Sequence, residues 1–248
     1  MDRSIYTAMS GASQTMARQA AVAHNLANAN SSGYKAEEHR LRAVAVQGAA
    51  GSLPTRAFAI DASTHTDFTP GPMSGTGRPL DVAVQGAGWI ALQLPDGSEA
   101  YTRNGAFELN VNGVLQTRQG IPVQGDGGTI SIPPEVKVGI AADGTISALP
   151  ESGAQNTPTN VGRIKLVNPP LADLVRDEDG LFRLKSGDAA PADETVSVTG
   201  GTLEASNVNA AEQMVHMISL SRQFELQMKM ISSANDNDKA AVQILSVR

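Results

Sequence analysis

The chain has 248 residues, with 25 acidic residues against 19 lysines and arginines, which is long enough for one large domain or two small ones. A formal net charge of -6 without a basic stripe argues against nucleic-acid binding. No run of about 18 consecutive apolar residues is present to span a membrane. The absence of cysteine excludes disulfides and thiolate sites without fixing the compartment. No cleaved signal peptide is expected from the opening MDRSIYTAMSGASQ.

Glycine and proline are concentrated in the middle of the chain. All 13 prolines lie between Pro54 and Pro191, and 20 of the 24 glycines lie between Gly71 and Gly201. Seven of the eight methionines lie in the first 16 residues or after residue 213. Helix-favouring ends therefore flank a turn-rich middle, and this division predicts an α+β fold.

The opening segment predicts an amphipathic helix. Apolar residues recur there at steps of three and four, the period of one helical face; they are Ile5, Met9, Ala12, Met16, Ala20, Ala23 and Ala27. The stretch NLANANSSGYK (25–35) follows, and asparagine and glycine tolerate the left-handed conformation in which helices end. We interpret it as a hinge with Asn28, Asn30, Gly33 and Tyr34 as turn residues.

The closing segment predicts a long helix with a strict seven-residue repeat, the seam of a coiled coil. Asn209, with Glu212 three residues later, marks its start as a capping-box-like pair. The predicted seam consists of Met214, Met217, Ser221, Phe224, Met228, Ile231, Asn235, Asp238, Val242 and Leu245. Polar residues occupy it at Asn235 and Asp238, which either set the register or mark a kink; the register interpretation is preferred.

The two terminal helices are expected to pair with each other as a coiled coil, since neither has a partner in the middle of the chain. Their outer faces carry further apolar residues, namely Leu26, Val215, Ile218, Leu220, Leu226, Met230 and Ile244. Other copies of the chain are expected to bury them in a helical, open-ended assembly. The predicted assembly interface is Ile5, Met9, Met16, Met214, Met217, Phe224, Met228, Ile231, Val242 and Leu245.

The middle predicts an all-β domain, a small sandwich or barrel-like sheet. Short alternating runs such as DVAVQ and WIALQL are separated by hairpin dipeptides. These dipeptides are Asp96-Gly97, Asn112-Gly113, Asp126-Gly127 and Asp143-Gly144. The expected domains are a helical domain of residues 1–35 with 205–248, an extended connector of 36–75 and an all-β domain of 76–204.

No catalytic, cofactor or metal site is predicted. The histidines His24, His39, His65 and His216 are far apart, without the spacing of metal ligands. Asp177-Glu178-Asp179-Gly180 lacks the rest of a calcium loop and is expected to be an acidic turn. Gly75-Thr76-Gly77 lacks the third glycine and the helix of a phosphate loop. Trp89 is expected in the β core.

Several stretches together resemble the bacterial flagellar axial proteins, the rod and hook subunits. These stretches cover nearly the whole chain in the family's order: NLANANSSGYKAE, RPLDVAVQGAGWIAL, DGSEAYTRNGAFELNVNGVLQT, AADGTIS and GTLEASNVNAAEQMVHMISLSRQFELQMKMI. MDRSIYTAM and RQFELQMK most resemble the proximal rod subunit, and the distal rod subunit is a close alternative.

The resemblance implies a structural subunit without catalysis or cofactor. Such subunits are exported unfolded by the flagellar type III apparatus, without a cleaved signal, and assemble with themselves and with other rod subunits. The implied product is a hollow rod that crosses the periplasm and transmits torque from rotor to hook. Paired terminal helices would line the tube, with the β domain outside. Gly33 would then supply a permissive backbone and Tyr34 a packing anchor where the chain turns outward.

A different class of function is compatible with the same pattern. A β-rich module that recognises cell-wall glycan, dimerised by its coiled-coil ends, predicts discrete dimers with ligand affinity. A rod subunit predicts stacked assembly with other rod subunits instead.

Overall fold

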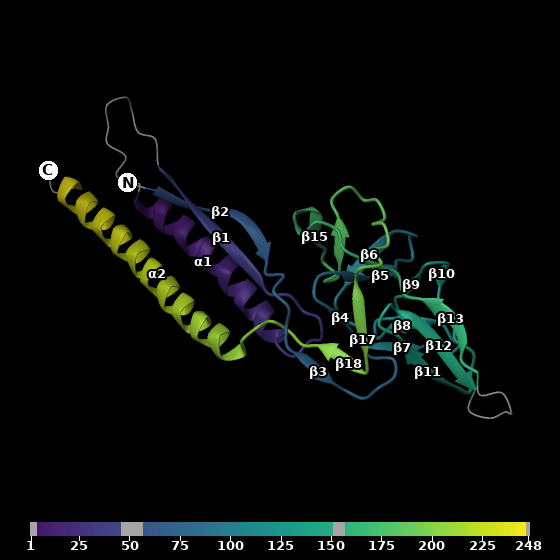
Figure 1. Ribbon diagram of the computed structural model, residues 1–248. Helices are drawn as coiled ribbons and strands as arrows, with labels where there is room; N and C mark the ends of the chain where they lie inside the picture. The colour runs from purple at the N-terminus through teal and green to yellow at the C-terminus, as the bar shows by residue number, and fades with distance from the viewer. Residues whose placement is uncertain (1–3, 46–56, 151–156, 247–248) are drawn as a thin grey trace. The chain divides into compact units, whose positions relative to one another are not determined.

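The computed structural model describes residues 4–45, 57–150 and 157–246 (Figure 1). They belong to two units, each built from separate stretches of the chain. The first, here called the helical unit, comprises Met1–Ala29, Ala36–Asp67 and Val208–Arg248. The second, the β-rich unit, comprises Asn30–Lys35 and Phe68–Asn207. The fold is therefore α+β, with helices near both ends of the chain.

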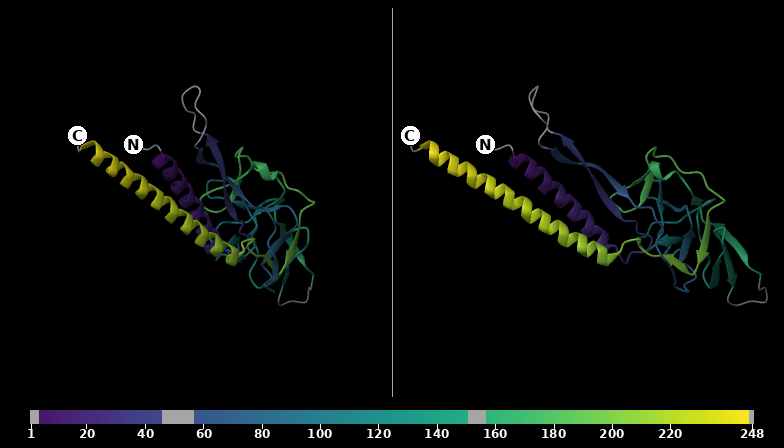
Figure 2. Two further views of the ribbon diagram at one scale, coloured as in Figure 1. Left: turned by 90° about the vertical axis from the view of Figure 1, so that its left-hand side faces the viewer. Right: turned by 60° about the vertical axis from the view of Figure 1, so that its left-hand side comes forward.

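The helical unit has two helices and one β-hairpin. Its elements are α1 (Ser4–Ala27), β1 (Glu37–Ala45), β2 (Ala57–Thr66) and α2 (Ala210–Ser246). Helix α1 lies beside α2 on one side and beside the β1–β2 hairpin on the other (Figures 1 and 2). Neither described helix is long and apolar enough to cross a membrane.

Side chains and backbone groups mark the ends of both helices as the sequence predicts. At the end of α1, the backbone N–H and the side-chain amide of Asn28 both donate to the carbonyl of His24. At the start of α2, the Asn209 carboxamide oxygen accepts from the N–H groups of Ala211 and Glu212, at 3.1 and 3.4 Å. Helix α2 then continues for 37 residues, about 55 Å, through Asn235 and Asp238.

The hairpin lies within the range predicted as an extended connector. Its strands are antiparallel from Glu37↔Thr66 to Ala45↔Ala57, with an irregularity between Arg40 and Leu41. The Asn25 side chain holds it against α1, because its amide donates to the Glu37 carbonyl at 2.8 Å and its oxygen accepts from the Glu37 N–H at 2.9 Å. The Asn25 side chain thus makes to the Glu37 backbone the same pair of hydrogen bonds that a neighbouring strand would make. These bonds hold the first residue of β1 against α1.

The β-rich unit contains short antiparallel strands. The larger sheets have the orders β14-β5-β6-β16-β15 and β11-β12-β13, and the pairs are β3 with β18, β4 with β17, β7 with β8 and β9 with β10. A 3-10 turn, Leu171–Asp173, precedes β15. The strands are β3 (Met73–Gly75), β4 (Val82–Gln85), β5 (Trp89–Gln93), β6 (Glu99–Thr102), β7 (Phe107–Leu109), β8 (Leu115–Thr117), β9 (Gln124–Gly125), β10 (Gly128–Thr129), β11 (Val136–Ile140), β12 (Thr145–Pro150), β13 (Thr159–Arg163), β14 (Leu166–Val167), β15 (Leu174–Arg176), β16 (Phe182–Leu184), β17 (Ser197–Gly200) and β18 (Thr202–Glu204).

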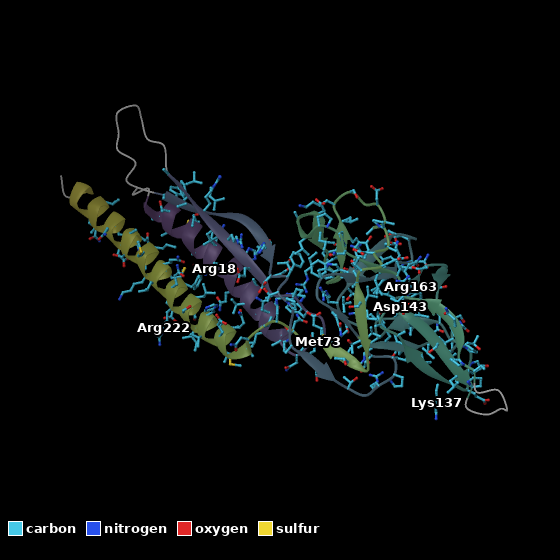
Figure 3. The ribbon with its side chains drawn as sticks, viewed as in Figure 1. Arg18, Met73, Lys137, Asp143, Arg163 and Arg222 are labelled. Carbon is cyan, nitrogen blue, oxygen red and sulfur yellow. The ribbon has the colours of Figure 1, made fainter. Side chains whose placement is uncertain are left out.

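All four predicted hairpin dipeptides connect strands that pair with each other. They join β5 to β6, β7 to β8, β9 to β10 and β11 to β12. Gly97, Gly113 and Gly144 have φ values of 85, 76 and 83°, a conformation that residues with a Cβ rarely adopt. Arg163 of β13 donates from Nε to the Asp143 carbonyl at 2.8 Å, and the two labelled side chains lie together in Figure 3. Turn chemistry therefore predicted the local pairings correctly.

Two hydrophobic clusters form the core of the β-rich unit. The larger includes Val82, Ile90, Phe107 and Ile146, all fully buried. The smaller surrounds Trp89, whose ring lies 4.6 Å from that of Phe182 and 5.8 Å from that of Phe68, between centroids. The prediction that Trp89 belongs to the core is confirmed. The strands around these clusters form several short ladders and not one regular sandwich.

Candidate assembly surface

The contact between α1 and α2 is made by small and polar residues of α1. The Thr15 hydroxyl donates to the Gln227 side-chain oxygen at 3.1 Å. A Cβ placed at Gly11 would lie 2.9 Å from the Gln227 nitrogen, so glycine allows this glutamine to lie against α1. The buried and half-buried face of α2 comprises Gln213, Met217, Leu220, Ser221, Phe224, Gln227, Ile231 and Ala234.

This face coincides only in part with the predicted seam. Met217, Phe224 and Ile231 lie on it as expected, whereas Met214 and Met228 are exposed. Gln213 and Gln227, one residue earlier in each case, occupy the less exposed positions. The physical reason lies in α1, where Gly11 and Thr15 leave room and a hydrogen-bonding partner for Gln227. Hydrophobic periodicity alone selects the methionines.

The other predicted interface residues are mostly exposed. Met9 and Met16 on α1 have exposed fractions of 54 and 57%, and Ile5 is half-buried. Val242 on α2 is also exposed, and the side chain of Leu245 lies outside the described residues. Leu220, expected on the outer face, is instead buried on the face of α2 that includes Phe224. The remaining exposed large apolar residues of the two helices are Tyr6, Val215, Ile218, Leu226 and Met230.

Helix α2 therefore exposes apolar residues on the side away from α1 as well. Ile218 and Leu226 are more than half exposed there, and Arg222, about one helical turn from each of them, projects from the same outer side (Figure 3). A helix that is apolar around most of its circumference is normally buried on all sides. Exposed apolar side chains gathered on a helix are typical of contact sites for other proteins. We use the name outer apolar surface for six exposed apolar side chains of the two helices, namely Met9 and Met16 on α1 and Met214, Ile218, Leu226 and Met228 on α2.

The predicted hinge residues lie at the end of α1 and in the turn that follows it. Asn28 bonds the last turn of the helix, and Asn30 is exposed. Gly33 has a φ of 67°, in a turn closed by the Tyr34 N–H and the Ser31 carbonyl. Tyr34 is buried, with the Arg176 guanidinium 4.4 Å from its ring centroid. Gly33 thus has a backbone conformation that favours glycine and Tyr34 is packed, while their roles where the chain turns outward in an assembly stay predictions.

Three buried charges beside this turn escape sequence-based prediction. The Glu204 carboxylate contacts Lys35 Nζ at 2.6 Å through Oε1 and Arg103 Nη1 at 3.1 Å through Oε2. The Gly71 N–H also donates to Oε1, at 2.9 Å. The only signal in the sequence is a charged residue within each of the stretches SSGYK, YTRNG and GTLEAS, and charges in such turn-rich stretches are usually solvated.

Burial and pairing act in opposite directions on Arg103. Burial lowers the pKa of its guanidinium, and the Glu204 carboxylate counteracts that shift. The carbonyls of Val84 and Gly86 accept further bonds from Arg103, at 3.4 and 2.6 Å. This network is suited to holding chain segments together, because its charges are paired and shielded from any solute.

The described residues do not gather the side chains of a metal site. Within them, no three histidine, aspartate or glutamate side chains are grouped so as to hold an ion. An open hollow of about 730 Å³ in the β-rich unit is lined by Pro169, Pro170, Leu184 and Pro191 among others. None of the predicted site residues lines this hollow.

Family models match three separate parts of the chain. The model described as "Flagella basal body rod protein" matches residues 5–35, and "Flagellar hook protein FlgE/F/G D1 domain" matches residues 83–148. "Flagellar basal body rod FlgEFG protein C-terminal" matches residues 199–244. These segments include α1 with its turn, the middle of the β-rich unit, and Glu204 with most of α2.

Curated relatives extend the similarity to the full length. The chain is 49% identical over 253 residues to the flagellar basal-body rod protein FlgF of Escherichia coli (strain K12), covering all of both chains. It is 46% identical to FlgF of Salmonella typhimurium, again over all of both chains. Identity to FlgG of Buchnera aphidicola subsp. Acyrthosiphon pisum is 32%, over 86% of this chain and 88% of the relative. The chain therefore belongs to the family of flagellar basal-body rod proteins that includes FlgF.

Proposed function

We propose that the protein is a structural subunit of the flagellar basal-body rod, in the proximal position. It assembles helically through its terminal helices into a hollow shaft that transmits torque from rotor to hook. In this proposal the helical unit is the assembly domain and the β-rich unit is the outer domain, with bounds that differ from the predicted 1–35 with 205–248, 36–75 and 76–204 because residues 30–35 belong to the β-rich unit and the hairpin of 36–67 to the helical unit. The full-length identity to FlgF supports the rod function, and the lower identity to FlgG favours the FlgF position.

The observation that carries the proposal is the outer apolar surface of the two helices. Six large apolar side chains on α1 and α2 are about half exposed in a single copy. Taking such a side chain from full exposure to full burial is worth about 1.5–3 kcal/mol, so burying the exposed part of each contributes roughly half of that and favours association with further helices. Burying them in neighbouring copies gives each subunit the same contacts, which generates a helical assembly when the contact does not close into a ring.

The α1–α2 contact supplies the second element of the proposal, a coiled coil within each subunit. The inner face of α2 keeps a seven-residue period through Gln213, Leu220, Gln227 and Ala234. A continuous helix of 37 residues suits a load-bearing element, because all of its interior backbone groups are bonded along the axis.

The proposed partners are other copies of this chain and other proximal and distal rod subunits. The flagellar export apparatus is a transient partner, which would pass the chain unfolded. The proposed location is the flagellar basal body, where the rod crosses the periplasm. The proposal includes no catalysis and no cofactor, in keeping with the structural role that the relatives' names describe.

Incorporation into basal bodies tests the function directly. The chain is expressed in an Escherichia coli strain that lacks its own FlgF, and basal bodies are isolated and analysed by mass spectrometry. We expect the chain in the rod fraction and recovery of swimming. Escherichia coli FlgF expressed in the same way is the control. Recovery of the control alone, with this chain confined to the soluble fraction, would contradict the proposal.

Hydrogen exchange on the dilute monomer separates a rod subunit from a self-sufficient binding module. A rod subunit awaiting partners is expected to exchange quickly over most of residues 1–29 and 208–248, with protection across 80–200. A closed glycan-binding dimer would instead be protected throughout, and it would bind isolated cell-wall glycan saturably.

A further inference from the structure

Residues 30–35 lie in the β-rich unit although the rest of that unit begins at Phe68. Their backbone groups form hydrogen bonds to the rest of the unit, as the backbone of a bound peptide does to its binding protein. The Gly33 N–H donates to the Glu204 carbonyl at 2.7 Å, and the Tyr34 carbonyl accepts from the Asn207 N–H at 3.4 Å. The Lys35 carbonyl accepts from Arg176 Nη1 at 2.9 Å. The backbone of each of these three consecutive residues therefore has a hydrogen-bond partner among residues 176–207.

Each of the three residues also contacts a different group among residues 68–207, and these groups together form the receiving surface of the β-rich unit. A Cβ at Gly33 would lie 2.3 Å from the backbone of Arg103 and Asn104, so only glycine fits there. The Tyr34 ring stacks against the guanidinium of Arg176. Lys35 is 1% exposed, and its ammonium donates to the Glu204 carboxylate and to the Thr69 carbonyl at 2.9 Å. The surface is thus complementary to the sequence Gly-Tyr-Lys.

The receiving surface is also held by hydrogen bonds among residues 68–207, without residues 33–35. Arg103 and the Gly71 N–H hold the Glu204 carboxylate in place, and both belong to residues 68–207. The carboxylate therefore has partners besides Lys35 that would keep it oriented. Such preorganisation lowers the cost of binding, because the receiving groups need no rearrangement.

We propose that the β-rich unit carries a peptide-binding site for a Gly-Tyr-Lys segment, and that residues 33–35 of the same chain fill it. Glu204 selects the lysine, Arg176 the tyrosine, and the backbone at Arg103 and Asn104 the glycine. The site does not depend on the proposed rod function. Because Lys35 follows α1 and Glu204 precedes α2 in sequence, filling the site joins the segment after α1 to the segment before α2 through one carboxylate.

Competition by a peptide in trans tests the site. The full-length Tyr34→Ala/Lys35→Ala variant weakens the internal occupant and leaves Glu204, Arg103 and Arg176 unchanged. The probe is the synthetic peptide Ser-Ser-Gly-Tyr-Lys-Ala-Glu, blocked at both ends, and the control peptide has alanine at the tyrosine and lysine. The readout is the thermal unfolding midpoint followed by Trp89 fluorescence, since the Trp89 ring lies 5.4 Å from the Arg103 guanidinium.

We expect the probe peptide to raise the midpoint of the variant saturably by a few degrees, and the control peptide to leave it unchanged. The wild-type chain should respond at least tenfold more weakly, because its own segment competes at an effective concentration of the order of millimolar. Equal responses to the two peptides, or no response at several millimolar peptide, would overturn the proposal.

Hydrogen exchange on the wild-type chain keeps the proposal testable if the double variant does not fold. The amides of Gly33 and Asn207 are both bonded across the filled site. We expect each to exchange at least a hundredfold more slowly than an unstructured amide, and at rates similar to each other. Unprotected exchange at Gly33 alongside a protected Leu92 in the core would overturn the proposal.

Discussion

Gly33 combines two requirements that no other residue type meets at its position. Its φ of 67° favours glycine, and its α-carbon passes so close to the Arg103 backbone that a side chain has no space. The contacting atoms belong to the backbone, so they cannot rotate away as the tip of a flexible side chain can. The glycine of NLANANSSGYK is therefore needed for close packing as well as for the turn.

Gly33→Ala is expected to destabilise the β-rich unit by about 2 kcal/mol or more, from left-handed strain and displaced backbone together. Gly97→Ala is the matched control, because Gly97 has a φ of 85° and open space around its α-carbon. That control is expected to cost about 1–2 kcal/mol from strain alone. Urea unfolding followed by Trp89 fluorescence measures both. Equal costs would show that the close approach to Arg103 is unimportant.

Glu204→Gln removes the carboxylate that pairs two buried cations. Breaking a buried ion pair by removing one partner typically costs about 3–5 kcal/mol, because the remaining charge is left uncompensated. Glu194→Gln is the control, since Glu194 is 87% exposed and 3.9 Å from Arg163. We expect the urea midpoint to fall strongly for the first variant and to stay unchanged for the second. A small effect of Glu204→Gln would contradict the charge network as drawn.

Tyr101 makes the stability of the β-rich unit sensitive to alkaline pH. Burial raises the pKa of its hydroxyl, and nearby Glu99 adds to the shift, against the bond donated by the Ala190 N–H. The folded state therefore keeps this proton to higher pH than the unfolded state, so stability is full below about pH 10 and falls as pH rises further. Tyr101→Phe should flatten that part of the urea-midpoint profile. Tyr6→Phe, on an exposed ring of α1, should leave the slope unchanged.

At the scale of elements, the sequence predicts best where a single local rule decides the structure. The Asp-Gly and Asn-Gly turns, the cap at Asn209 and the helical ends follow from short-range chemistry, and all are present. The predicted inner face of α2 differs from the observed one by one residue at two positions. At one of them Gln227 lies against α1, because Gly11 leaves room for it and Thr15 bonds it. Periodicity within α2 carries no information about that partner.

The two faces of α2 are expected to respond differently to charge. Phe224→Asp or Ile231→Asp places a charge on the inner face, and should abolish assembly and loosen the α1–α2 contact while the β-rich unit stays folded. Ile218→Asp, on the outer face, should abolish assembly and leave the monomer's helical content unchanged. Sedimentation with rod subunits and circular dichroism measure these effects.

Ile218→Leu serves as the control for that series, because it keeps the volume and apolar character of the side chain. It should assemble as the wild-type chain does. Normal assembly of the Phe224→Asp and Ile231→Asp variants would contradict the proposed coiled coil. Normal assembly of Ile218→Asp would exclude the outer apolar surface as the contact between subunits.

At the scale of the whole molecule, the distribution of glycine, proline and methionine was sufficient to predict an α+β protein with helical ends. It did not predict that residues 30–35 belong with the β-rich unit, or that a hairpin lies beside α1. Both depend on pairings between polar groups of separate segments, Lys35 with Glu204 at 169 positions and Asn25 with Glu37 at 12. A lysine or an asparagine is common at a solvated turn, so its burial becomes visible only in three dimensions.

The contact between Lys35 and Glu204 spans 169 positions of sequence. A chain that ends before Glu204 leaves Lys35 without its carboxylate, and the segment after α1 cannot dock. The same holds for a chain that has emerged only in part, from a ribosome or from a narrow channel. One buried pair thus forms only when nearly the whole polypeptide is present, and an incomplete subunit lacks the contact that joins the segment after α1 to the segment before α2.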